Sequence, residues 1–226
     1  MTIETAPSPD GDNTVLVIDD HPLFRRGVTQ LLALDPRLRL VGEASTGEEG
    51  LALALERQPD LVLLDLNMKG VDGLETLIRL RTRNFDGRIV MLTVSDSATD
   101  LVAAIRAGAD GYLLKDMEPE ELLQRIRDAL FGRMVISERL AGVLAEAMRG
   151  EAQAASRNAS LGELTDRERE ILGCLAAGMS NKLAARELDI TEGTVKVHVK
   201  NLLKKLGFRS RVEAAIWAVE RGLRRP

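Results

Sequence analysis

The chain has 226 residues, a net charge of −4, and a composition of 45% hydrophobic and 29% charged residues, which is typical of a globular protein. No apolar run approaches the roughly 18–20 residues of a membrane-spanning helix, and residues 1–13 lack the basic start and apolar centre of a signal peptide. The one cysteine, Cys174, has no partner for an internal disulfide, as expected in a reducing compartment. These features exclude a membrane-spanning protein and predict a cytoplasmic one, with residues 1–13 as a disordered arm.

Short apolar runs alternate with longer segments of helical period from residue 14 to about residue 134. Strands and helices in this order predict βαβ units and a parallel sheet, so residues 14–134 form one α/β domain. The strands are continuously apolar, as expected when helices cover both faces of the sheet. The expected strands span 14–18, 38–44, 61–65, 88–93 and 110–114, and the expected helices span 22–34, 47–57, 73–83, 97–107 and 119–131.

Residues 135–160 are expected to connect this domain to a second one. An amphipathic helix is predicted from Ser137 to about Met148. Residues 150–160, rich in Ala, Ser, Gln and Glu, have the composition of a flexible linker.

Only helices are predicted in residues 161–226. A capping box of Thr165 and Glu168 begins the first helix, and a short helix follows at about 180–188. Thr191 caps the third helix, which runs to Gly207, and the last helix begins at Ser210 and ends near Gly222. Four short helices joined by tight turns predict a helix-turn-helix module. This region carries 13 Lys and Arg against 9 Asp and Glu, whereas residues 1–160 carry 18 against 26, so nucleic acid is expected to contact the C-terminal domain.

Polar side chains end four of the apolar runs. Asp19 and Asp20 follow the first run, Asp65 ends the third, Thr93 ends the fourth and Lys115 follows the fifth. The C-terminal ends of parallel strands lie along one edge of a sheet, where α/β proteins bind ligands. An acidic pair after a strand is by itself as often a helix cap or loop charge, but its combination with the other residues predicts one polar site.

The residue types at this edge suit a divalent cation. Mg²⁺ prefers hard oxygen ligands. Asp20, Asp65 and the backbone carbonyl of Asn67 are expected to bind it, with Asp19 holding a metal-bound water. The cation relieves the repulsion between the clustered carboxylates.

The same residues suit phosphoryl transfer, which depends on positioning and charge neutralisation. Asp65 is expected to attack as a nucleophile and form an acyl phosphate. Lys115 then pairs with one phosphoryl oxygen, and Thr93 hydrogen-bonds another.

Three segments resemble the receiver domain of two-component response regulators: 17–21 (Val-Ile-Asp-Asp-His), 64–68 (Leu-Asp-Leu-Asn-Met) and 111–116 (Gly-Tyr-Leu-Leu-Lys-Asp). The resemblance implies a flavodoxin-like fold with sheet order 2-1-3-4-5. It also implies that Asp65 accepts phosphate from a sensor histidine kinase. A receiver is a phosphoacceptor with at most self-phosphorylation and autodephosphorylation activity, so we do not expect an enzyme with a separate substrate.

The resemblance further implies that Thr93 and Tyr112 form a switch pair, in which Thr93 moves toward the phosphoryl group and Tyr112 turns inward behind it. The residue pattern alone also allows Tyr112 to be a half-buried aromatic at a strand end. His21 is open between a catalytic base and a residue that orients its loop. Lys69 stands where the family usually has Pro, which affects the loop near Asp65 and the phosphate lifetime without removing a ligand.

The third helix of the C-terminal module is amphipathic. Val195, Val199, Leu202 and Leu206 form its core stripe. A second stripe holds Lys196, Lys200 and Lys204, with Val197 beside it. Such a stripe is often a solvated basic face, but the second helix of a helix-turn-helix enters the major groove, where lysine can bind guanine and valine can meet a thymine methyl. Phosphate contacts are expected from Asn181, Lys182, Thr191, Thr194 and Lys205.

Residues 164–172 and 194–200 resemble the start and the recognition helix of a LuxR-type helix-turn-helix domain. With the receiver, this resemblance identifies the NarL/FixJ class over residues 14–223. Within that class, residues 112–119, 194–200 and 210–215 favour the nitrate/nitrite regulators. Gly193 departs from the usual Ser and weakens the helix start by up to ~1 kcal/mol.

Two other functions fit the sequence less well. An aspartate-nucleophile phosphatase needs a second acid two residues after the nucleophile, and Asn67 stands there. An RNA-binding output, as in antitermination regulators, fits the recognition helix less well than duplex DNA. Two further expectations concern assembly. Val212, Ala215, Ile216 and Val219 are expected to form the core stripe of the last helix, so that an outward Trp217 pairs two copies on inverted DNA half-sites. The unphosphorylated receiver is expected to dock on the basic helix and hide Lys196 and Lys200.

Overall fold

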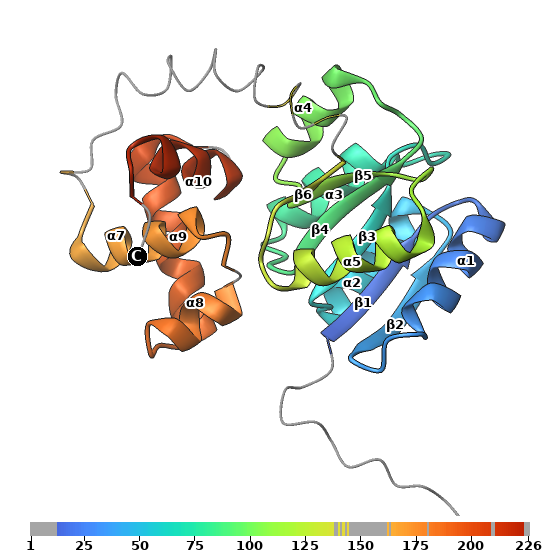
Figure 1. The fold of residues 1–226 in the computed structure, drawn as a ribbon, viewed down its shortest axis with the longest axis horizontal. Helices are drawn as coiled ribbons and strands as arrows, with labels where there is room; N and C mark the ends of the chain where they lie inside the picture. The colour runs from blue at the N-terminus through green and yellow to red at the C-terminus, as the bar shows by residue number, and fades with distance from the viewer. Residues whose placement is uncertain are drawn as a thin grey trace, which may run out of the picture.

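The computed structural model describes residues 13–137, 140, 142, 144, 162, 164–179, 181–208 and 211–223. The expected arm, most of the helix predicted at 137–148, and the linker predicted at 150–160 lie outside the described residues. Figure 1 shows an α/β domain beside a smaller helical one.

The N-terminal domain is the predicted parallel sheet covered by helices on both faces. Its sheet order is β2-β1-β3-β4-β5-β6, with all pairings parallel, so the flavodoxin-like order 2-1-3-4-5 is confirmed. Its elements are β1 (Asn13–Ile18), α1 (Pro22–Leu32), β2 (Leu38–Ala44), α2 (Gly47–Arg57), β3 (Leu61–Asp65), α3 (Gly73–Thr82), β4 (Arg88–Thr93), α4 (Ala98–Arg106), β5 (Gly111–Leu114) and α5 (Pro119–Leu130).

A sixth strand, β6 (Val135–Ile136), extends the sheet beyond the five predicted ones and pairs with β5. These residues were assigned to the connecting segment, because two apolar residues carry too little pattern to identify a strand. Ser137 continues the attachment: its amide N–H donates to the carbonyl of Tyr112 (3.2 Å), and its hydroxyl accepts from the amide of Leu114 (3.0 Å). The connecting segment is therefore fixed to β5 where it leaves the domain.

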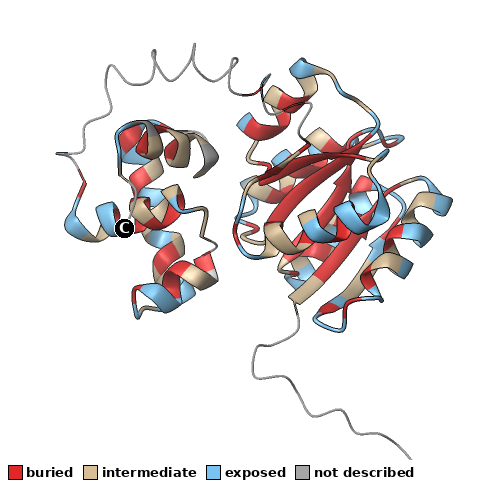
Figure 2. Ribbon diagram, viewed as in Figure 1, coloured by how far each residue is buried: buried red, intermediate tan, exposed pale blue. Residues whose placement is uncertain are grey.

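The apolar core lies on both faces of the sheet. Alternate residues of each strand point to opposite faces, so Leu16 and Ile18 pack under α2, α3 and α4, whereas Val15 and Val17 pack under α1 and α5. All residues of β3, β4 and β5 are buried, and Figure 2 shows these strands as the buried centre of the domain. The buried sheet is a rigid base for the side chains at its edges.

The C-terminal domain has the four predicted helices: α7 (Asp166–Ala176), α8 (Asn181–Glu187), α9 (Glu192–Leu206) and α10 (Arg211–Glu220). The capping box of Thr165 and Glu168 is confirmed. The helices enclose their own apolar cluster, in which Cys174 is fully buried. Among the described residues, no helix is long and apolar enough to cross a membrane.

The expectation that Trp217 faces outward is wrong. Trp217 is 1% exposed and packs edge-to-face on Phe208, with ring centroids 5.5 Å apart. The buried stripe of α10 contains Ala214, Trp217 and Ala218, whereas Ile216, expected in the core, is only partly buried. The large indole determines which face of α10 turns inward, because it buries the most apolar surface. Trp217 therefore cannot serve as the dimer contact.

Candidate functional site

The polar strand ends meet at the carboxyl edge of the sheet, as predicted. The Nζ atom of Lys115 lies 2.7 Å from Oδ2 of Asp19 and 2.9 Å from Oδ2 of Asp65. Asp19 and Asp65 are each 2% exposed, and Lys115 is 8% exposed. Thr93, at the end of β4, is also buried and is hydrogen-bonded by the Asn67 side-chain amide (3.4 Å). Residues from four strands thus form one site.

The acidic part of the site has the donors that a hard divalent cation prefers. Asp19, Asp20, His21 and Asp65 each offer one ligand atom, and these atoms all lie within 4.8 Å of one another. Asp20 is tied to the neighbouring loop, because its Oδ2 accepts from the amide of Lys69 (3.2 Å). Three clustered carboxylates fit Mg²⁺. Coordination by the carbonyl of Asn67 stays a prediction.

Burial and charge act in opposite directions on Asp65. Burial raises the pKa of its carboxyl above the ordinary value, and the Lys115 ammonium partly offsets this. The nearby Asp19 carboxylate adds to the rise in the pKa of Asp65. A bound cation favours the ionised carboxylate, which is the nucleophilic form, so the electrostatics of the site also fit the metal.

His21 belongs to the acidic cluster, a placement that the sequence left open. Its Nδ1 lies 2.9 Å from Oδ1 of Asp20, and its amide N–H donates to Oδ1 of Asp19 (2.8 Å). The ring is 65% exposed. The main-chain bond to Asp19 orients the loop between β1 and α1.

Thr93 and Tyr112, the expected switch pair, both hydrogen-bond to the main chain of Ser95. The Thr93 hydroxyl accepts from the amide of Ser95 (3.0 Å), and the Tyr112 hydroxyl donates to the carbonyl of Ser95 (3.1 Å). Tyr112 is fully buried rather than half-buried, and burial raises the pKa of its hydroxyl to about 12. The inward position of the ring is thus the one that the structure shows.

The recognition helix α9 has the predicted two faces. Val195, Leu202 and Leu206 are buried, and Val199 packs against the same cluster. On the other face, Val197 is 58% exposed. Lys200 and Lys204 are exposed to solvent as well, and Lys200 lines a groove together with the receiver residues Asn84 and Gly108, so the occlusion of Lys200 from DNA stays a prediction.

Lys196 is the member of the basic stripe that contacts the receiver. Its Nζ lies 2.9 Å from Oδ2 of Asp86, in the loop before β4, and 3.8 Å from Oε1 of Glu192. Glu192 lies four residues before Lys196, an acidic partner that the interpretation of the basic stripe overlooked. The receiver therefore contacts one side of the recognition helix.

Two of the expected phosphate-contacting residues have structural partners. Lys205 donates to Oε2 of Glu168 (2.7 Å), which is the buried acid of the capping box, because the end of α9 lies beside the start of α7. Asn181 is 8% exposed and accepts from Arg211 (3.4 Å).

Thr191 and Thr194 share the cap of α9. The Thr191 hydroxyl accepts from the amide of Thr194 (3.1 Å), and the two hydroxyl oxygens are 2.8 Å apart. The side chain of Lys182 lies outside the described residues.

Comparisons with known proteins define the class. Residues 15–127 match the response regulator receiver domain, and residues 162–218 match the bacterial regulatory proteins of the luxR family. The chain belongs to the two-component response regulators that join a receiver to a LuxR-type DNA-binding domain.

The chain is 55% identical over 204 residues to the nitrate/nitrite response regulator protein NarL of Escherichia coli (strain K12), covering 90% of this chain and 94% of that protein. It is 39% identical over 212 residues to the DNA-binding transcriptional activator DevR/DosR of Mycobacterium tuberculosis (strain ATCC 25618 / H37Rv), covering 94% and 96%. The solved receiver domain of NarL from Mycobacterium tuberculosis is similar with a TM-score of 0.53 at 36% identity, covering 54% of this chain and 98% of that one.

Proposed function

We propose that this chain is a cytoplasmic transcriptional regulator whose DNA binding is controlled by phosphorylation of Asp65. The observation that carries the proposal is the position of Lys115 between Asp19 and Asp65. A buried ammonium within 3 Å of the acceptor carboxylate stabilises added phosphoryl charge at low dielectric.

In the proposed reaction, a carboxylate oxygen of Asp65 attacks the phosphorus of a phosphohistidine on a sensor kinase. The new P–O bond forms as the P–N bond breaks, and the freed imidazole takes up a proton. Lys115 pairs with one phosphoryl oxygen, and the Thr93 hydroxyl donates to another. Asp19, Asp20 and Asp65 would hold Mg²⁺, which supplies charge neutralisation when it is bound.

Closure of the two domains is proposed to inhibit DNA binding. A recognition helix must enter a major groove about 12 Å wide, which requires both of its flanks to be free. In the structure, Lys196 forms an ion pair with Asp86 of the receiver. The receiver residues Asn84 and Gly108 line a groove together with residues of α9. Phosphorylation can open this arrangement only if the phosphoryl group interacts more favourably with the open state.

The signal and the target are proposed from the relatives. Because E. coli NarL is a nitrate/nitrite response regulator, we infer that this chain responds to nitrate or nitrite through its sensor kinase. It is proposed to bind duplex DNA as a homodimer on inverted half-sites, through Lys196, Val197 and Lys200 at the bases. The dimer contact does not involve Trp217.

The test uses a duplex selected from random-sequence DNA by the phosphorylated chain. Acetyl phosphate with Mg²⁺ should label Asp65, which mass spectrometry locates, and labelling should increase the affinity for this duplex. Asp65→Asn should abolish both effects, and chelation of the cation should abolish labelling. Asp72→Asn, which changes an exposed cap of α3, is the matched control and should label normally. Undiminished labelling of Asp65→Asn would refute the site, and an unchanged affinity after labelling would refute the regulation.

A further inference from the structure

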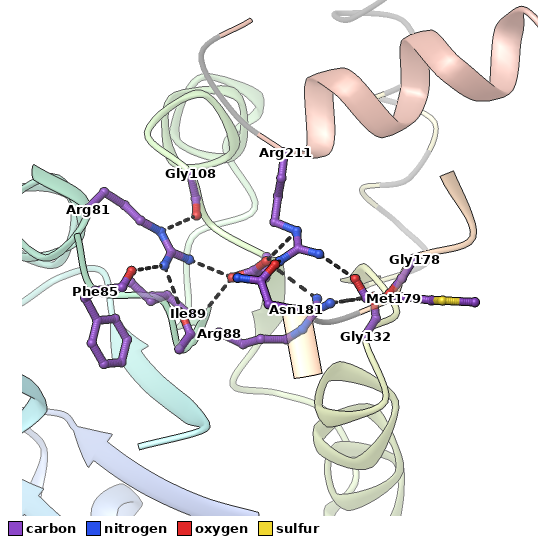
Figure 3. A network of polar contacts seen from close by, with 12 residues as sticks. Arg81, Phe85, Arg88, Ile89, Gly108, Gly132, Gly178, Met179, Asn181 and Arg211 are labelled. Atoms are coloured by element: carbon purple, nitrogen blue, oxygen red, sulfur yellow. Dashed lines mark hydrogen bonds and ion pairs between the residues drawn. The ribbon is translucent and has the colours of Figure 1, made fainter. Parts of the chain in front are cut away.

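The buried polar contacts between the two domains gather around Asp110, whose arginine partners Arg81, Arg88 and Arg211 are labelled in Figure 3. Asp110 directly precedes β5 and is 2% exposed. Its carboxylate lies 2.7 Å from Arg81 Nη2, 3.5 Å from Arg88 Nη1 and 3.9 Å from Arg211 Nε. Arg81 and Arg88 belong to the receiver, whereas Arg211 begins α10. One buried carboxylate is therefore shared by both domains.

Arg88 joins the domains through their main chains. Its Nη2 donates to the carbonyl of Gly132 in the receiver (2.8 Å) and to the carbonyl of Gly178 in the DNA-binding domain (3.3 Å). Arg211 donates to the carbonyl of Met179, in the same turn between α7 and α8. We call Arg88, Asp110, Gly178 and Arg211 the interdomain clasp.

The turn approaches the receiver closely at Gly178. A Cβ atom on Gly178 would lie 3.2 Å from the carbonyl oxygen of Gly132, which is closer than ordinary van der Waals contact. Gly178 also has a φ of +75°, a conformation that glycine adopts without steric cost. Both the conformation of the turn and the close approach of the two domains therefore require glycine at position 178.

The clasp differs from the ion pair between Lys196 and Asp86 in burial and order. Those two side chains are 35% and 34% exposed, and pairs of this kind contribute little because solvent screens them and a flexible lysine must be ordered. The side chain of Arg88 is 7% exposed and is already held by Gly132 and Asp110 within the receiver. Its bond to Gly178 thus forms with little further loss of side-chain entropy.

We propose that the interdomain clasp, rather than the ion pair of the recognition helix, sets the equilibrium between the closed and open arrangements of the domains. This inference rests on the proposed function in one respect, that closure is inhibitory. The two clasp residues of the receiver, Arg88 and Asp110, lie at the amino ends of β4 and β5, and Thr93 and Lys115 lie at the carboxyl ends of the same two strands. A change at the phosphoryl site therefore acts on strands that also carry the clasp.

The interdomain clasp combines attractive contacts with an electrostatic repulsion that favours opening. Three guanidinium groups surround one carboxylate, which leaves an excess of positive charge at the junction. Burial, and then the neighbouring Arg88, lower the pKa of Arg211 to about 10. The closed arrangement thus includes an unfavourable electrostatic contribution that separation of the domains relieves.

The experiment measures the distance between spin labels at Gln124→Cys on α5 and Asn201→Cys on α9 in the unphosphorylated full-length chain. Both positions are exposed, and the native Cys174 is buried. Arg88→Met should raise the ratio of open to closed chains by about tenfold or more, because the carbonyl of Gly178 loses its charged donor in the closed arrangement. Asp86→Asn should raise it by less than about fivefold. Arg79→Met removes a pair with Glu75 inside α3 and should leave the ratio unchanged.

Equal opening by Asp86→Asn and Arg88→Met would overturn the proposal, as would unchanged distances in Arg88→Met. If Arg88→Met prevents folding of the receiver, Arg211→Met makes the same test from the other domain and should also open the chain, and unchanged distances there would overturn the proposal equally. DNA affinity separates this inference from the proposed function. Variants that open without binding DNA more tightly would support the clasp and refute inhibition by closure.

Discussion

Replacement of Trp217 by alanine should strongly destabilise the DNA-binding domain. The indole is 1% exposed, contacts the Phe208 ring edge-to-face, and lies 4.2 Å beneath the guanidinium of Arg221. Truncation of a buried large aromatic costs about 3–5 kcal/mol through lost transfer free energy and a residual cavity. Small domains have total stabilities of about 5–15 kcal/mol, so this loss is a large share.

Trp217→Phe is the matched control. The indole N–H has no acceptor among the described residues, so phenylalanine removes a buried donor without breaking a hydrogen bond. We expect it to cost about 1–2 kcal/mol, within the ordinary range of point mutations. Hydrogen exchange of the α7 and α9 amides in the full-length chain measures both variants. If the free energy of protection of these amides in Trp217→Ala stays within about 1 kcal/mol of the wild-type value while the dimer on DNA is lost, the buried role of Trp217 is refuted and an outward dimer contact is supported.

Three further outcomes follow from the structure. Tyr112 is the only tyrosine, so its absorbance titration is unambiguous: it should ionise near pH 12 in the folded chain and near pH 10 when unfolded, and its contribution to stability is present below pH 10 and lost above it. Asp35, whose pKa Arg37 holds well below the ordinary value, should stabilise the receiver at neutral pH, so Asp35→Asn should unfold at lower urea there. The difference should shrink progressively as the pH falls below about 4 toward the lowered pKa of the folded state, and a constant difference would exclude this linkage. Lys205→Met should lower the melting temperature of the DNA-binding domain, because Glu168 loses its partner, and should weaken binding to all DNA sequences alike. Loss of DNA affinity at an unchanged melting temperature would assign Lys205 to phosphate contact only.

The polar site at the carboxyl edge of the sheet was predictable because its signals are local to each strand. Asp19, Asp65 and Lys115 each follow a short apolar run, and the rule that parallel strands share a carboxyl edge brings them together without knowledge of side-chain positions. His21 was harder to place, because its role depends on the conformation of the loop after β1. The apolar runs identify the strands and their ends, whereas a loop side chain is positioned by contacts that leave no periodic pattern in the sequence.

The contacts of the C-terminal domain with the receiver had no comparable signal. In the sequence, Arg88 is a charged residue at the start of an apolar strand, and its partner Gly178 lies 90 residues away. The pairing of Lys205 with Glu168 spans 37 residues and depends on how α9 crosses α7. The position of Trp217 was predicted wrongly because the last helix has an alternative apolar stripe of Val212, Ala215, Ile216 and Val219, whereas the alanines beside Trp217 pack closely around the buried indole.

A main-chain carbonyl takes part in the contact between the two domains. Arg88 of the receiver donates to the carbonyl of Gly178, a group that every amino acid carries, and Arg211 holds the same turn within its own domain by donating to the carbonyl of Met179. Side-chain changes elsewhere on the helical domain can therefore alter which DNA sequence is read without disturbing the surface that the receiver recognises. A chimaera that exchanges the reading helix but keeps the glycine turn should remain under receiver control, which makes this junction a portable connector for building regulators with new targets.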